Sequence, residues 1–150
     1  MPPIDTDPDA VAALLRTRTM DENGVEGGVF TETTRPTLEQ VEHLVEEARR
    51  KVVGIIGTAE PCTADLTADA ANVVHLRAAM LVELSYFPEQ INTNRSPYEQ
   101  LKDLYDTDVK SLAEAIAETC GTGIGEEGVN NQVPSYGYGE APVIGKRTVW

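Results

Sequence analysis

Residues 123–128, Gly-Ile-Gly-Glu-Glu-Gly, have the spacing of a dinucleotide-binding turn. Such a turn must lie between a strand and a helix, because its amide groups face the pyrophosphate there. In this chain it follows an expected helix, and two glutamates stand where the phosphates would approach. We therefore interpret the segment as a flexible linker.

Asp5-Thr6-Asp7-Pro8-Asp9 begins as a calcium-binding EF-hand loop begins. That loop needs glycine at its sixth position to turn the chain and glutamate at its twelfth to bind calcium with both oxygens. The chain has Ala10 and Arg16 at those positions. No calcium site is expected.

The remaining candidates for chemistry are isolated. Zinc sites use three or four ligands, whereas His43 lies beside acids and His75 in an apolar stretch, so we interpret them as ordinary surface and core histidines. Cys62 and Cys120 lack CxxC spacing and are interpreted as reduced structural thiols. The pair at 46–47, Glu-Glu, is interpreted as part of a solvated helix face. The sequence predicts no catalytic site, no metal and no cofactor.

The chain of 150 residues carries a net charge of −13. Such acidity argues against a face that grips phosphates, because non-specific DNA affinity comes from Lys and Arg. No run of eighteen apolar residues exists, and the N-terminus has acids and prolines instead of a signal peptide's basic and apolar start. We expect a soluble protein without a membrane span or an export signal.

The elements that these residues belong to are mainly helical. Asp7-Pro8 predicts the start of a short helix that fades near Thr17. A capping box, Thr37-Leu-Glu-Gln40, opens a helix over about 37–53, and Gly54 or Gly57 ends it. Between them, residues 20–34 are expected to form a loop or loose hairpin, in which residues 29–31 could pair as a strand.

Two further helices complete the expected core. Residues 65–87 are apolar nearly all round, which is typical of a central helix, and replacing Leu81 with Asp is expected to abolish folding. Ser96 and Pro97 begin a third helix over about 96–118. Together they predict a mainly α protein: a small three-helix core with a short N-terminal helix and an extended C-terminal tail.

The composition divides the chain into three parts: an N-terminal helix and loop arm (1–36), a helical core domain (37–119), and a glycine-rich linker with a docking tail (120–150). The tail cannot bury enough apolar surface to fold alone, yet its last residues are apolar and basic. We expect it to become ordered only on a receiving surface. The expected docking residues are Val143, Ile144, Lys146, Arg147 and Trp150.

Two stretches, Thr33-Thr-Arg-Pro-Thr37 and Glu83-Leu-Ser-Tyr-Phe-Pro-Glu-Gln-Ile-Asn-Thr-Asn-Arg-Ser-Pro-Tyr98, together resemble the head-to-tail connector, or adaptor, proteins of long-tailed bacteriophages, especially those that infect actinobacteria. The resemblance covers roughly residues 8–118. Neither stretch is catalytic. The resemblance implies a non-enzymatic, ring-forming protomer with a helical fold.

The resemblance also implies partners and a location. Such protomers assemble, commonly as twelve copies, beneath the portal protein in the neck of the virion, after synthesis in the host cytoplasm. The ring joins the portal to the next neck or tail-completion protein, and genome DNA passes through its lumen without sequence-specific binding. Contacts in the ring are expected between helix faces and the 20–34 loop of a neighbour.

Two other interpretations remain open. One is an acidic helical interaction or regulatory module without a ring, which would stay a monomer or dimer in every condition. The other is a small hydrolase subunit whose site is completed by a partner, which would require loss of activity on mutating His75 or Cys62.

Overall fold

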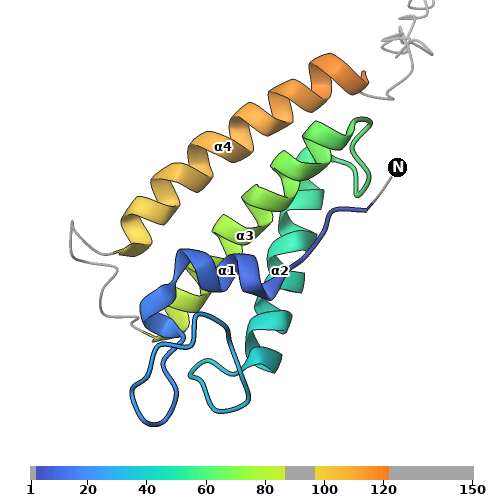
Figure 1. Ribbon diagram of the computed structural model, residues 1–150. Helices are drawn as coiled ribbons and strands as arrows, with labels where there is room; N and C mark the ends of the chain where they lie inside the picture. Colours follow the sequence, from blue (N-terminus) through green and yellow to red (C-terminus); the bar gives the residue numbers. More distant parts are fainter. Residues whose placement is uncertain (1–2, 87–96, 122–150) are drawn as a thin grey trace, which may run out of the picture.

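The structure, a computed structural model, describes residues 3–86 and 97–121. These ranges contain helices and no strand: α1 (Pro8–Leu14), the short 3-10 helix η1 (Arg16–Arg18), α2 (Leu38–Ile56), α3 (Ala64–Tyr86) and α4 (Pro97–Cys120). In Figure 1 the three long helices lie side by side, and α1 lies across α2 and α3. The prediction of a mainly α protein with three long helices and a short N-terminal helix is confirmed.

The predicted capping box opens α2. The Thr37 hydroxyl accepts from the Gln40 N–H at 3.4 Å, and the Gln40 side chain accepts from the Thr37 N–H at 3.1 Å. Gly57, with φ of 76°, ends the helix in the left-handed conformation, which glycine adopts without steric cost. The helix therefore runs three residues beyond the predicted end. Its buried stripe consists of Val41, Val45, Ala48, Val52 and Ile56.

α3 is the central helix, as predicted. It packs against α1, α2 and α4, and it buries side chains on several faces: Leu66, Ala70, Val73, Val74, Leu76, Ala78, Ala79, Met80 and Val82. Leu81 is only partly buried, so Val82, with no exposed surface, is a sharper test of the core. Thr63 precedes the helix, and its hydroxyl accepts from the Leu66 N–H at 3.2 Å. Thr63 therefore caps α3.

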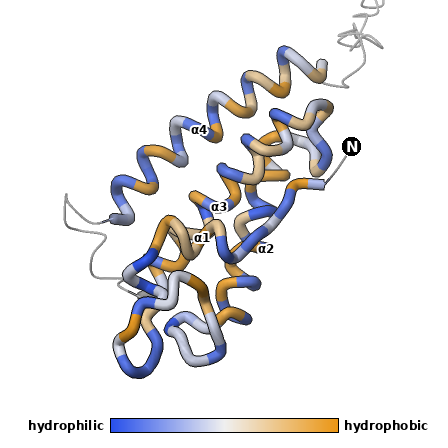
Figure 2. Tube along the Cα trace, in the orientation of Figure 1, coloured by the Kyte–Doolittle hydropathy of each residue, from blue (hydrophilic) through white to orange (hydrophobic). Residues whose placement is uncertain are grey.

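α4 runs antiparallel to α3, because Cys120 at its end meets Cys62 before α3, and Tyr105 meets Arg77 midway along α3. Its apolar stripe of Leu101, Tyr105, Leu112 and Ile116 is buried. In Figure 2, polar residues recur along α4 between its apolar positions. Ser96, the predicted cap, lies outside the described residues.

The interpretation of Cys62 and Cys120 as reduced thiols is wrong. The two form a disulfide whose Cα atoms are 5.6 Å apart, a separation typical of such bridges. They are 58 residues apart in sequence, so no local spacing signals the pair. Only the antiparallel packing of α3 and α4 brings them together.

The strand considered for residues 29–31 is not present. Phe30 lies in the core with 3% of its surface exposed, and it anchors the loop that leads into α2. The only ladder contact in the described arm is an isolated antiparallel bridge between Met20 and Glu26. One buried aromatic side chain thus replaces the expected pairing.

Candidate functional site

Residues 20–29, which we call the knob, form an ordered turn at the loop end of the molecule. The Asp21 carboxylate accepts from the N–H groups of Asn23 and Val25 at 2.8 and 2.9 Å. The Asp21 N–H donates to the Val25 carbonyl at 3.0 Å, and Gly24 supplies the positive φ of 77° that the turn needs. These hydrogen bonds, first that of Val25, lower the pKa of Asp21. The turn of the knob is therefore held by the side chain of Asp21 and by the backbone of the knob.

The base of the knob is fastened to the helices. The buried Thr19 hydroxyl accepts from the Gly28 N–H at 3.0 Å and donates to the Arg16 carbonyl at 2.7 Å. Next to it, the Arg18 guanidinium contacts both carboxylate oxygens of Glu83 on α3, at 2.8 and 3.0 Å. Glu83 is only 3% exposed, so this is an ion pair inside the protein. Such two-point contacts fix orientation as well as distance.

The knob and the adjoining end of α1 expose most of the large apolar side chains found on the described surface. The exposed fractions are 61% for Val25, 46% for Leu14, and 41% for Met20 and Val29. Figure 2 shows apolar and polar stretches alternating over these loops. Exposed apolar groups rimmed by polar residues are typical of interaction sites.

A second feature, which we call the α2 groove, lies beside the start of α2 and has a volume of about 730 Å³. Its described lining contains two residues that can carry positive charge, Arg35 and His43, and no acid. Leu44 is half-buried and Pro36 is buried in this lining. The described lining consists of Arg35, Pro36, Thr37, Gln40, His43, Leu44 and Ser85.

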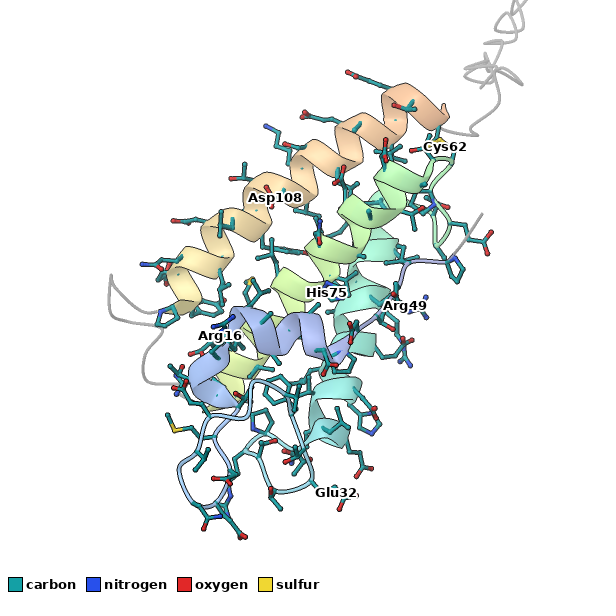
Figure 3. All side chains as sticks on the ribbon, viewed as in Figure 1. Arg16, Glu32, Arg49, Cys62, His75 and Asp108 are labelled. Carbon is teal, nitrogen blue, oxygen red and sulfur yellow. A yellow bond between two sulfur atoms is a disulfide. The ribbon has the colours of Figure 1, made fainter. Side chains whose placement is uncertain are left out.

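A smaller groove of about 360 Å³ lies between α3 and α4. Its apolar lining comes from Val73, Leu112 and Ala115, and its acids are Asp69 on α3 and Asp108 on α4. Asp108, labelled in Figure 3, belongs to the exposed side of α4. The lining of this groove thus carries acids, whereas the described lining of the α2 groove carries none.

The histidines lie where a structural interpretation predicts them. His75 is 9% exposed, and its Nε2 accepts from the Asp7 N–H at 3.3 Å. Burial lowers the pKa of His75, although the carboxylates of Asp7 and Asp5 act in the opposite direction. His43 is exposed on α2. In the ranges 3–86 and 97–121 no three His, Cys, Asp or Glu residues are placed to hold a metal ion.

The acidic pair at 46–47 lies on the outer face of α2. Hydrogen bonds from Arg49, together with the nearby Arg50, lower the pKa of Glu46 to about 2. Its carboxylate is thus ionised and paired along the helix, which is a structural arrangement. Cys62, shown in Figure 3, carries no free thiol, because it is bonded to Cys120.

Two buried polar contacts escaped the sequence analysis. One is the Arg18–Glu83 ion pair; an acid at position 83 within an apolar helix was the available signal. The other is Arg77, whose guanidinium lies 5.5 Å from the centre of the Tyr105 ring. The Arg77 Nε and the Tyr105 hydroxyl are buried and have no hydrogen-bond partner among the described residues. Burial raises the pKa of Tyr105.

The expected docking residues of the tail, Val143 to Trp150, lie outside the described residues and stay predictions. Within the described part of the chain, no helix is long and apolar enough to cross a membrane. No protein-family model, curated protein sequence or solved structure matches this chain.

Proposed function

We propose that the protein is the protomer of a head-to-tail connector ring in the neck of a long-tailed bacteriophage. The proposal rests on the sequence resemblance carried by residues 33–37 and 83–98. The structural observation that supports it best is the knob, an ordered loop that presents Met20, Val25 and Val29 to solvent. A loop whose hydrogen bonds hold apolar side chains toward solvent is suited to contacts with other chains.

The charge fits a channel that DNA passes through. Twelve copies at −13 each would place on the order of −150 charges around one axis, and DNA is repelled by a negative lumen. The ring therefore lets the genome slide without holding it. The portal and the next neck protein are its partners in this proposal, and the virion neck is its location.

The C-terminal tail supplies the attachment. In this proposal Val143, Ile144 and Trp150 are the apolar anchors of the tail, and Lys146 and Arg147 are among its few bases. An extended segment can pair with a sheet edge through its main chain while alternate side chains fill pockets. The receiving surface is the portal or a neighbouring protomer.

Electron microscopy of this protein mixed with its portal tests the proposal. High salt should be used, because it screens the repulsion between acidic copies. A ring on the portal is expected. If the two proteins never co-migrate and the chain stays a monomer or dimer throughout, the acidic interaction module without a ring becomes the better interpretation.

Deletion of residues 136–150 tests the tail separately. The described helices end before the deleted segment, so the truncated chain should keep their circular dichroism and its cooperative melting. Attachment to the portal should be lost. Unchanged attachment would remove the tail from the proposal while leaving the ring intact.

A further inference from the structure

We infer that the knob of one copy docks in the α2 groove of a second copy. This inference deepens the proposed function and rests on it for the number of copies in the assembly. It concerns two surfaces that the structure describes, and it does not involve the tail.

The charges of the two surfaces are opposite. The knob contains Asp21, Glu22 and Glu26 and no Lys or Arg. The described lining of the α2 groove contains Arg35 and His43 and no acid. Opposite potentials steer partners together and suppress wrong pairings. In a chain with 25 acids and 12 bases, a groove whose described lining holds no acid repels an acidic loop less than the groove between α3 and α4 does.

Arg35 is the residue that makes this groove receptive. It is exposed, and it makes no ion pair within the part of the chain that the structure describes. The groove between α3 and α4 is the contrasting case. Asp69 and Asp108 line it, so it would repel the acids of the knob. Charge therefore selects one of the two grooves.

Both the knob and the α2 groove contain apolar side chains. Val25 is the most exposed large apolar residue of the described chain, and Met20 and Val29 of the same loop are also exposed. Leu44 and Pro36 lie in the α2 groove. Seating the knob there would remove Val25 and the exposed part of Leu44 from water. The acids of the knob would lie at the polar rim, which is the usual anatomy of an interface.

The knob of a protomer does not line its own α2 groove. Knob and groove lie side by side at the loop end, separated by a depression that Met20, Asp21, Glu22 and Arg35 line together with other residues. Thr19 and Arg18 hold the base of the knob, and its apolar side chains stay exposed in the protomer. The knob thus leaves its own groove open for a neighbour's knob.

A photo-cross-linking amino acid at position 25 tests the contact in the full-length chain. Equal amounts of isotopically heavy and light protein are mixed, so that mass spectrometry distinguishes links between two copies from links within one. We expect mixed heavy–light links from position 25 to residues 35–44 or to Ser85. The absence of mixed links, or mixed links elsewhere, would overturn the inference.

A charge exchange tests the electrostatic part. Arg35→Glu should lower the yield of mixed links about tenfold or more, because close charge pairs across interfaces contribute strongly. Adding Glu22→Arg should restore it. Glu32→Arg, on the neighbouring loop marked in Figure 3, and Lys110→Glu on α4 are matched controls, and both should leave the yield unchanged. All four positions are exposed, and circular dichroism verifies folding. Failure of the second charge to rescue the first would overturn the pairing.

The size of the linked product separates this inference from the ring. A closed ring supports both. A dimer in which two copies exchange both contacts, the isologous arrangement, supports the knob–groove contact and contradicts the ring. A ring on the portal whose position-25 links fall outside the groove overturns this inference alone.

Discussion

The segment just before α3 is joined to the end of α4 through the disulfide between Cys62 and Cys120. Near its other end α3 is joined to the N-terminal arm through the ion pair between Glu83 and Arg18. The first link is covalent, and its chemistry depends on redox conditions. The second depends on charge, and it orders a loop that otherwise has few buried side chains.

The side chains that surround the disulfide differ from those that surround the ion pair. Around the disulfide the helices bury Ile56, Leu66 and Ile116, so apolar packing already holds the helices together. Around the ion pair the loop is held by Thr19, Phe30 and hydrogen bonds, and the knob exposes Met20, Val25 and Val29 to solvent. One end of the molecule is thus held by a covalent bond and apolar packing, whereas the other end holds apolar side chains toward solvent.

The largest expected effect comes from the core that both ends share. Val82→Asp would place an unpaired charge at a position with no exposed surface, which costs several kcal/mol. We expect loss of cooperative thermal melting by circular dichroism. Leu104→Asp, on α4 at 53% exposure, is the matched control and should melt nearly as the original does. A cooperatively melting Val82→Asp protein would contradict the central place of α3.

Removing the disulfide should have the next largest effect. Replacing Cys62 and Cys120 with Ala frees a loop of 58 residues, for which the chain-entropy model gives about 4 kcal/mol of lost stability. Urea unfolding of the variant measures the loss. We expect the helical spectrum to persist in water, because the neighbouring apolar side chains remain buried. A collapse of the helical signal would show that packing at this end depends on the bridge.

Breaking the ion pair at the other end should follow. Arg18→Met leaves the carboxylate of Glu83 buried without its partner, at a cost of about 3 kcal/mol. Adding Glu83→Met should recover much of this lost stability, because neither charge of the pair then remains. Backbone amide exchange of residues 20–29 should rise in both variants if the pair orders the knob. Equal stability of the single variant would contradict the buried pair.

The smallest expected effect is the pH dependence of His75. Burial depresses its pKa in the folded state below the ordinary 6.5, so the unfolded chain binds the proton more readily. Stability should therefore rise with pH through the window just below 6.5 and level off above it. His75→Phe should flatten this slope, whereas His43→Phe, on the exposed face of α2, should keep it. Urea unfolding at several pH values measures both.

Local features of the fold were predictable because their causes are local. Thr37 and Gln40 satisfy the free N–H groups at the start of α2, and Gly57 can adopt the conformation that ends it. The all-apolar stretch that became α3 pointed to a central position for the same reason: no face of it prefers water. Helix existence and order followed from these patterns, and helix ends were correct within three residues.

The candidate site was less predictable. Residues 20–34 were expected to form contacts, and residues 29–31 were considered as a strand, but Phe30 is buried there as an anchor. The receiving groove was not identified, because Arg35, Leu44 and Ser85 come from separate segments. The predicted docking residues of the tail remain untested.

The sequence by itself determined the helices, their caps, the strong negative charge and the acidity of the knob, since each depends on neighbouring residues or on composition. Only the tertiary structure decided which distant groups meet: Cys62 with Cys120, Arg18 with Glu83, and Arg77 with the Tyr105 ring. Each of these pairs depends on the register of packed helices or on the path of the arm over α3. That register is set by many buried apolar contacts acting together, and no short stretch of sequence carries it.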